Sequence, residues 1–264
     1  MGSVFGNRAF IPSVLGFASI AKAFKMKILV AVLLMLSFAF SETTVPKFSA
    51  DSLVIFAGDF SSPAAFWHQG NIKLPQIYVW FHGGMQSSKC AKGYEAGKAL
   101  VPFLEKASGE SAVVSVSACK ENHWLTQQAL LAVDYALDSM EARFHIQIDT
   151  VSLVGISDGG LGVVGYTLYG KRTVKSRLLI STNLAAVADA QNLLQDPKIR
   201  EGSWTFMQGG LDRLYPPERI LPWLERFCSG LGAKFCKIRF DERGEHDWSW
   251  WISFRRAWIQ NFFP

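Results

Sequence analysis

Ser157 stands in the pentapeptide GISDG at 155–159, directly after the apolar run at 150–155. A G-x-S-x-G turn between a strand and a helix holds its serine on a tight bend, where the hydroxyl is exposed for nucleophilic attack. Both flanking glycines have a steric reason, because a β-carbon there would collide with neighbouring backbone. Since a serine hydroxyl is a poor nucleophile by itself, the motif predicts a nucleophile that needs a base. The alternative interpretation is a glycine-rich turn with a capping serine.

A glycine pair ends another apolar run, QIYVWF at 76–81, which is followed by HGGM at 82–85. Such a pair lets the backbone turn so that an amide N–H points at the carbonyl oxygen of a bound ester. We expect Gly84 to supply this first donor, with Met85 as the alternative, and the amide of Asp158 to supply the second. His82 is expected to be a structural hydrogen-bonding residue rather than the base, because it lies in the loop that shapes this turn.

A carboxylate and a histidine follow in the chain order that such a serine requires, each after a further predicted strand. Asp212 closes the segment GGLD after the run at 204–208, and His246 lies in GEHD after the run at 236–241. We predict that His246 is the base and that Asp212 orients its ring and stabilises its protonated form. Other residues that stay open for these roles are, as acids, Asp189, Asp241 and Asp247 and, as a weaker base, His123.

The elements that must position these residues alternate between two periodicities. Short runs rich in β-branched or aromatic residues predict strands at 52–57, 76–81, 112–117, 150–155, 177–182, 204–208 and 236–241. Helical patterns separate them, most clearly at 126–144 and 216–227. Several strands are apolar on both faces, which indicates a mainly parallel sheet with helices on both sides. The predicted fold class is therefore α/β, as a single domain over residues 42–264.

The segments FHGGM, GISDGG, GGLD and GEHDWSWW resemble the α/β-hydrolase family over roughly residues 50–262. The resemblance is to its secreted small esterases, which include poly(3-hydroxybutyrate) depolymerase-like, feruloyl esterase-like and esterase D-like proteins. It implies an acyl-enzyme mechanism in which Ser157 attacks an ester carbonyl, with His246 as base and Asp212 as the carboxylate that orients the imidazole. Asp158 departs from many relatives, since a carboxylate beside an oxyanion donor would oppose negative charge unless its side chain points away.

The substrate is narrowed by the length of one connection. The segment between Thr182 and Trp204 is too short for the large lid that some relatives insert, so we expect an open site and a small-molecule or polymer ester. Trp124 is the tryptophan expected to contact substrate. The other candidate aromatics, which are expected to pack mainly in the core, are Trp248, Trp250, Trp251 and Trp258.

Other activities remain open at this point. The same three residues serve acyltransferases, thioesterases and peptidases, and an inactive binding protein with this fold is a further alternative. No cofactor is expected, and no cysteine or histidine spacing suggests a metal site.

The amino-terminal segment has the layout of a signal peptide. Three lysines precede an apolar run at 28–40, and small residues at its end favour cleavage after Ser41. The run is shorter than the roughly 20 residues of a spanning helix, so we predict removal of residues 1–41 and no stable membrane span. Met26 is a possible true start, and an uncleaved anchor or a core helix is the alternative. The mature protein is then secreted or periplasmic.

Charge does not favour a nucleic-acid partner. The formal net charge is +5, from 27 basic and 22 acidic residues. Four of the basic residues precede Glu42, the first acidic one, which leaves 23 against 22 in the remainder of the chain. A remainder this close to neutral carries no excess of positive charge for binding phosphates.

All four cysteines lie after the predicted cleavage site, where an oxidising compartment would let them pair. We expect Cys228 to pair with Cys236 across a turn-like stretch, and Cys90 to pair with Cys119, since both follow strand ends. The alternative is buried free thiols, because sequence spacing does not establish the distance between α-carbons that a disulfide requires.

Overall fold

In a computed structural model, the described residues are 48–69, 73, 75–84, 87–107 and 109–263. The predicted signal peptide and Met85 lie outside this range. The described residues form one eight-stranded sheet with strand order β1-β2-β4-β3-β5-β6-β7-β8. The strands are β1 (Phe48–Ala57), β2 (Phe60–Gln69), β3 (Gln76–Phe81), β4 (Ser111–Val116), β5 (Thr150–Ile156), β6 (Thr173–Ile180), β7 (Ser203–Gly209) and β8 (Cys236–Asp241).

The sheet is mainly parallel, as predicted. Every neighbouring pair from β4 to β8 runs parallel, whereas β2 pairs antiparallel with both β1 and β4. β2 has no counterpart among the predicted strands, because FSSPAAFWHQ contains Pro63 and no β-branched residue. It is extended because it pairs along its whole length with β1 and shares five further residue pairs with β4. Tertiary pairing here overrides a weak local preference.

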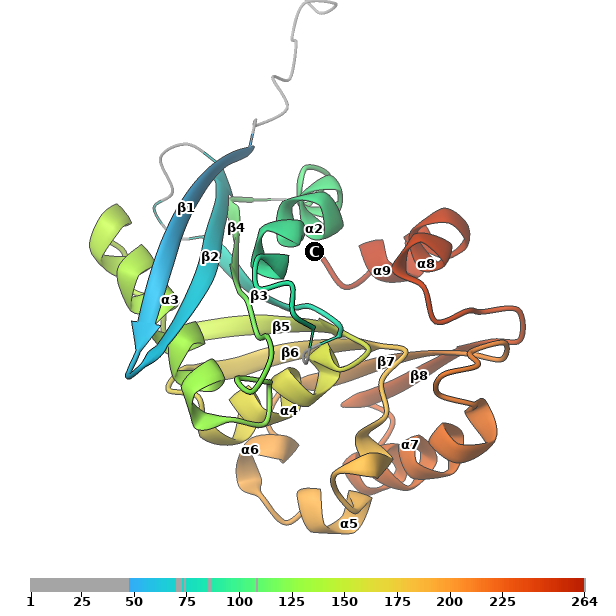
Figure 1. The fold of residues 1–264 in the computed structure, drawn as a ribbon. Helices are drawn as coiled ribbons and strands as arrows, with labels where there is room; N and C mark the ends of the chain where they lie inside the picture. The colour runs from blue at the N-terminus through green and yellow to red at the C-terminus, as the bar shows by residue number, and fades with distance from the viewer. Residues whose placement is uncertain (1–47, 70–72, 74, 85–86, 108, 264) are drawn as a thin grey trace, which may run out of the picture. The chain divides into compact units, whose positions relative to one another are not determined.

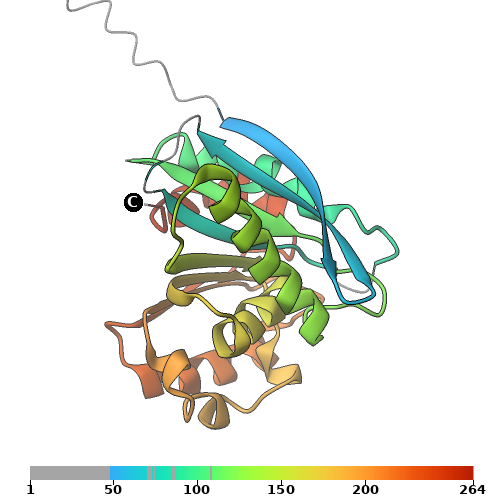
Figure 2. The same ribbon diagram turned by 90° about the vertical axis from the view of Figure 1, so that its left-hand side faces the viewer.

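Helices cover both faces of the sheet (Figure 1). On one face lie α3 (Gln127–Phe144), α4 (Gly159–Tyr169) and α7 (Pro217–Leu231), and on the other lie α2 (Ala96–Leu104), α8 (Trp248–Phe254) and α9 (Arg256–Gln260). Figure 2 shows α3 running along its face beside the β1–β2 hairpin. Alternate residues of the central strands enter two separate apolar cores, one under each helical layer.

The predicted helices at 126–144 and 216–227 correspond to α3 and α7. Thr126 caps α3 by accepting a hydrogen bond from an amide of its first turn, and two prolines precede the body of α7. The β6–β7 connection contains three short helices, η2 (Leu184–Ala186), α5 (Ala190–Leu193) and α6 (Pro197–Arg200). This agrees with the predicted absence of a large lid.

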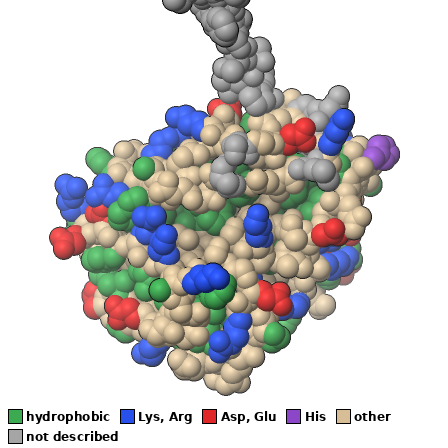
Figure 3. All heavy atoms as spheres, turned by 180° about the vertical axis from the view of Figure 1, so that it is seen from behind, with side chains coloured by type: hydrophobic (Ala, Val, Ile, Leu, Met, Phe, Trp, Pro, Cys, Tyr) green, Lys and Arg blue, Asp and Glu red, His purple; other side chains and the backbone are tan. Residues whose placement is uncertain are grey.

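Both expected disulfides are present, between Cys90 and Cys119 and between Cys228 and Cys236, with α-carbons 5.2 and 5.1 Å apart. Trp251 is fully buried in the second core, and the other three carboxyl-terminal tryptophans pack against that core, as predicted. No helix among the described residues is long and apolar enough to cross a membrane. On the face in Figure 3, basic and acidic side chains are interspersed, so no field of one sign covers it.

Candidate active site

Ser157 lies on the tight bend between β5 and α4. Its φ is +53°, and its amide donates a 2.9 Å hydrogen bond to the carbonyl of Ile180 at the end of the neighbouring strand. A β-carbon on Gly155 would lie 2.6 Å from the carbonyl oxygen of Gly159, and one on Gly159 would lie 2.0 Å from that of Phe81. Both glycines of the motif are therefore required, because backbone atoms approach too closely for any β-carbon. Ser157 has a left-handed backbone conformation that residues other than glycine rarely adopt.

Replacing Gly159 by Ala is expected to lower the free energy of unfolding by about 3 kcal/mol or more, because its β-carbon would meet backbone atoms that cannot move aside. The matched control is Gly165→Ala in the same helix, whose β-carbon would lie 3.2 Å from a flexible methyl of Leu130. We expect its effect to stay within about 1 kcal/mol. Urea denaturation of both variants measures the difference, and equal losses would contradict this assignment.

Asp212 and His246 come from loops after β7 and β8 that lie backbone against backbone. A β-carbon on Gly209 would lie 2.2 Å from the carbonyl oxygen of Gly244. The amide of Gly210 donates to Asp241 and the amide of Leu211 donates to Gly244, both at 2.8 Å. These contacts fix the two loops to each other, and with them the acid and the imidazole.

A continuous chain of hydrogen bonds joins the three predicted residues. Nε2 of His246 lies 2.9 Å from Oγ of Ser157. Nδ1 of the same ring lies 3.0 and 2.9 Å from the two carboxylate oxygens of Asp212. The structure therefore brings together residues that are 89 and 34 positions apart in the sequence. With a proton on Nδ1, Nε2 is free to accept the serine proton.

The Asp212 side chain is completely buried, and its carboxylate is held in the charged form. Burial by itself would raise its pKa, but hydrogen bonds from His246 and from two backbone amides outweigh burial, and the pKa lies below its ordinary value. Those amides belong to Leu214 and Tyr215, at 3.1 and 2.8 Å. A buried anion beside Nδ1 stabilises a positive charge on the ring, which is what a general base acquires.

The three alternative acids each bind another group. Asp189 caps α5 and Asp247 caps α8, both by accepting hydrogen bonds from backbone amides. Asp241 pairs with Arg255 and accepts a hydrogen bond from a backbone amide in its own loop. Asp212 is the acid that contacts His246.

The two alternative histidines also have other partners. Nε2 of His82 accepts a 2.9 Å hydrogen bond from the amide of Ala118, so Nδ1 carries the proton and donates to the carbonyl of Gly83 at 2.9 Å. Burial lowers the pKa of His82 to about 4, which keeps the ring neutral. Nδ1 of His123 accepts a hydrogen bond from the amide of Leu125. His82 thus has the structural position predicted for it.

Asp158 points its carboxylate at a residue that the sequence motifs did not mark. The hydroxyl of Tyr215 donates a 2.8 Å hydrogen bond to Oδ1 of Asp158, and its ring lies edge-on to His246 with centroids 5.0 Å apart. Burial, and then the bond to Asp158, raise the pKa of Tyr215 to about 12, so the hydroxyl stays protonated. The proximity of Tyr215 to Asp212 in the chain is the one signal that could have drawn attention to it.

Replacing Tyr215 by Phe is expected to lower kcat/KM for an ester about three- to tenfold, because the Asp158 carboxylate loses its donor beside the nucleophile. Asp158→Asn in the Tyr215→Phe background removes the uncompensated charge and should recover part of the loss. A double-mutant cycle with both single variants measures this coupling. Additive effects of the two substitutions would contradict it.

The residues expected to bind an oxyanion border Ser157. A β-carbon on Gly83 would lie 3.1 Å from the β-carbon of Ser157, and Gly84 has a φ of +63° that favours glycine. Asp158 precedes the first turn of α4, where amides have no carbonyl partner within the helix. Both predicted donors, the amides of Gly84 and Asp158, therefore belong to segments next to the serine.

Trp124 does not fit its predicted role. Its side chain is fully buried, its indole N–H donates a 2.9 Å hydrogen bond to the carbonyl of His82, and its ring lies edge-on to Phe81. A side chain without exposed surface has nothing to offer a substrate. Trp124 instead binds the carbonyl of His82 and so stabilises the loop that contains Gly83 and Gly84.

A pocket of about 860 Å³ borders Asp212 and His246. It lies between the loop after β7 and the segment before α8, and its lining includes Leu211, Arg213, Leu214, Pro216, Glu245 and Asp247. Leu211 and Leu214 are exposed. Within the described part of the chain, no group of three or more histidine, cysteine or acidic side chains is arranged to hold a metal.

Comparison with known proteins identifies the fold. No protein-family model matches the chain, and no curated protein matches it in sequence. Among solved structures, an esterase from Pyrococcus furiosus matches with a TM-score of 0.58 and 13% identity over 81% of this chain and 92% of that one. Poly(aspartic acid) hydrolase-1 from a Sphingomonas species matches at 0.58 and 15%, over 82% and 99%.

A Pyrococcus horikoshii acylaminoacyl peptidase matches with a TM-score of 0.56 and 12% identity, over 86% of this chain but only 42% of the peptidase. The described residues therefore have the α/β-hydrolase fold, with a single mixed and mostly parallel sheet between two helical layers. At such low identity, the comparisons establish the fold and leave the reaction to be argued from the site.

Proposed function

We propose that the protein is an exported serine esterase that cleaves carboxylic esters through an acyl-enzyme. Ser157 is the nucleophile, His246 the general base and acid, and Asp212 the residue that orients and stabilises the imidazolium. The observation that carries this proposal is the hydrogen-bond chain from Oγ of Ser157 through both ring nitrogens of His246 to a buried carboxylate.

In the first half-reaction, Oγ of Ser157 attacks the ester carbonyl while its proton passes to Nε2 of His246. The carbonyl π electrons move onto oxygen, and the amides of Gly84 and Asp158 stabilise the negative charge. Collapse of this tetrahedral species breaks the bond to the alcohol oxygen, which takes the proton from Nε2. The alcohol departs and the acyl group remains on Ser157.

In the second half-reaction, water takes the place of the alcohol. Nε2 of His246 removes a proton from the water as its oxygen attacks the acyl carbonyl, and a second tetrahedral species forms in the same site. Its collapse returns the proton to Oγ of Ser157 and releases the carboxylic acid. Throughout the cycle Asp212 stays ionised, in keeping with its lowered pKa.

The pocket beside His246 supports an ester with a sizeable alcohol part. His246 must protonate the leaving oxygen, so the alcohol part lies on the side of the imidazole. The pocket of about 860 Å³ includes His246 in its lining, and the β6–β7 connection contains only short helices and no large lid. A small-molecule alcohol or the end of a polymer chain has room there.

Export is proposed on two independent features. Both cysteine pairs form disulfides, which persist in oxidising compartments. The amino-terminal residues also have the charge and hydropathy pattern of a signal peptide. Each feature supports secretion to the medium or the periplasm.

The test is turnover of the purified protein on a matched panel, with p-nitrophenyl esters of increasing acyl length beside acetyl-sugar, feruloyl and hydroxybutyrate esters, an acyl thioester and an acyl peptide. We expect release of acid from the esters, with product formation that depends on protein concentration. Turnover confined to the thioester or the peptide, or acyl transfer to an added alcohol in place of hydrolysis, would replace the esterase assignment with that activity. A folded protein inactive on every substrate would favour the binding protein.

A further inference from the structure

The loop His82–Gly84 has all three of its carbonyl groups anchored. The carbonyl of His82 accepts from the indole of Trp124 at 2.9 Å. The carbonyl of Gly83 accepts from Nδ1 of His82 at 2.9 Å and from Nζ of Lys92 at 3.1 Å. The carbonyl of Gly84 accepts from the same Nζ at 3.3 Å and from the amide of Ser87 at 3.1 Å.

Anchoring the Gly83 carbonyl fixes the direction of the next amide. The Gly83–Gly84 peptide is trans, so the N–H of Gly84 points opposite to the carbonyl of Gly83. The carbonyl faces Lys92 and the ring of His82, and the N–H therefore faces away from both. A β-carbon on Gly83 would lie only 3.1 Å from the β-carbon of Ser157, so this peptide lies beside Ser157.

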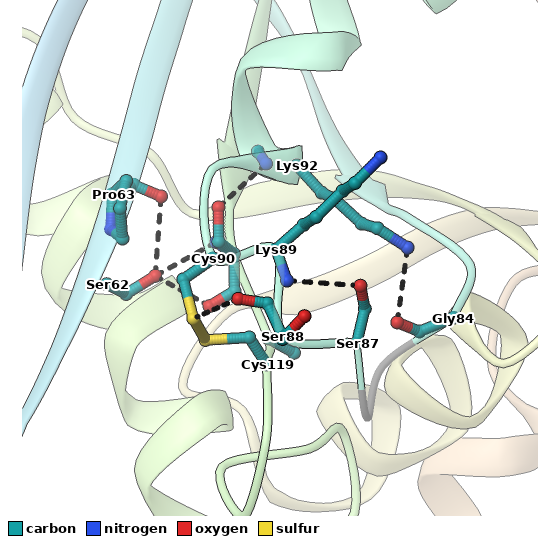
Figure 4. Close-up of a disulfide and its surroundings, with 12 residues drawn as sticks. Ser62, Pro63, Gly84, Ser87, Ser88, Lys89, Cys90, Lys92 and Cys119 are labelled. Carbon is teal, nitrogen blue, oxygen red and sulfur yellow. Dashed lines mark hydrogen bonds between the residues drawn. A yellow bond between two sulfur atoms is a disulfide. The ribbon is translucent and has the colours of Figure 1, made fainter.

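The residues that precede and follow Lys92 in the chain are both fixed by contacts to other segments (Figure 4). Two residues before it, Cys90 is bonded to Cys119, and directly after it the amide of Gly93 donates a 2.7 Å hydrogen bond to Oγ of Ser117. Lys92 begins the short helix η1 (Lys92–Glu95) and is half-buried. Within the described residues it pairs with no carboxylate, so its positive charge is directed at the two carbonyls.

We propose that Lys92 is a positioning residue for the oxyanion site, which acts through the Gly83–Gly84 peptide. Its ammonium group holds the peptide in one orientation and polarises it. A charge-assisted hydrogen bond to the carbonyl makes the N–H of the same peptide a stronger donor, and this donor acts on the negative charge of the transition state. The inference rests on the proposed esterase function, because it assigns a role within that same site.

The test compares Lys92→Met with Lys89→Met, a matched loss of one exposed lysine from the same loop. For Lys92→Met we expect kcat to fall roughly tenfold or more, which is less than the 10²–10³-fold typical of losing a direct donor, with KM within about twofold. The affinity for an arylboronic acid, which forms a tetrahedral adduct with an active serine, should fall by the same factor as kcat/KM. Lys89→Met should match wild type within about twofold in both readouts.

Two results would overturn the role of Lys92. One is equal kinetics for the two variants, and the other is a lower kcat in Lys92→Met with unchanged boronic acid affinity. Thermal unfolding checks that each variant is folded. If Lys92→Met does not fold, Lys92→Gln replaces it. Gln keeps a neutral donor and loses the charge, so kcat and boronic acid affinity should fall together, by a smaller factor than expected for Lys92→Met, and no change in either would overturn the proposal. Wild-type protein that neither turns over esters nor binds the boronic acid would reject the esterase function itself, a distinct outcome.

Discussion

Replacing Ser157 by Ala is expected to lower kcat/KM for p-nitrophenyl acetate by about 10⁴–10⁶-fold, since the acyl-enzyme cannot form without the nucleophile. The substitution removes one hydroxyl group whose hydrogen-bond partner is Nε2 of His246. The fold should stay intact, because the left-handed backbone at this position is held by the hydrogen bond from its amide to the carbonyl of Ile180 and by close glycine contacts.

Initial rates over a range of ester concentrations measure this effect. Ser203→Ala is the matched control, because Ser203 is an exposed serine that begins β7, at the end of the strand away from Asp212. Its activity should equal that of wild type. If Ser157→Ala retained more than about a hundredth of the wild-type rate, the observed hydrolysis would have to come from another group.

Replacing Asp212 by Asn is expected to lower kcat about 10³–10⁴-fold, the second largest effect. An amide can donate to Nδ1, which favours the wrong tautomer and removes the anion that stabilises the imidazolium. Asp247→Asn is the matched control, since Asp247 lies next to His246 in the chain but caps α8. Steady-state kinetics of both variants measures the contrast, and equal losses would reject Asp212 as the acid.

Asp212 also makes a distinct prediction for stability against pH. Its pKa in the folded protein lies below the ordinary value of 3.8, so its stabilising contribution is complete above that value and is lost as pH falls through the folded pKa. As pH falls below about 4, wild type should therefore lose stability more steeply than Asp212→Asn. Urea midpoints across that range measure the slopes, and parallel curves would show that the carboxylate is not held ionised by folding.

The grouping of Ser157, Asp212 and His246 was more predictable from the sequence than the whole of the scaffold that positions them. Ser157, Asp212 and His246 could be found because each follows a predicted strand, and parallel strands bring their carboxyl ends to one edge of the sheet. The flanking glycines were predicted to be required because a β-carbon would collide with neighbouring backbone, and the structure confirms this at Gly155 and Gly159. Both disulfides were also predictable, because one spans a short turn and the other joins two strand-end loops.

Residues that act through long-range contacts were not predictable. β2 forms because it pairs with β1 on one side and β4 on the other, and the ten residues of β2 alone do not indicate this pairing. Trp124 was expected to contact substrate because it lies near a strand end, yet its indole N–H donates to the buried carbonyl of His82. Tyr215 and Lys92 belong to no motif. The Tyr215 hydroxyl reaches Asp158, which lies 57 positions away in the chain. The Lys92 ammonium group reaches a carbonyl only 9 positions away, but the residue types alone do not show that contact.

The central claim is that His246 activates Ser157. Fluorophosphonate labelling followed by peptide mass spectrometry tests it most directly, on wild type and on His246→Ala. We predict a single adduct on Ser157 in wild type and labelling at least about 10³-fold slower in His246→Ala, because the oxygen then lacks its base. An adduct on another residue, or equal labelling rates in the two proteins, would contradict the account.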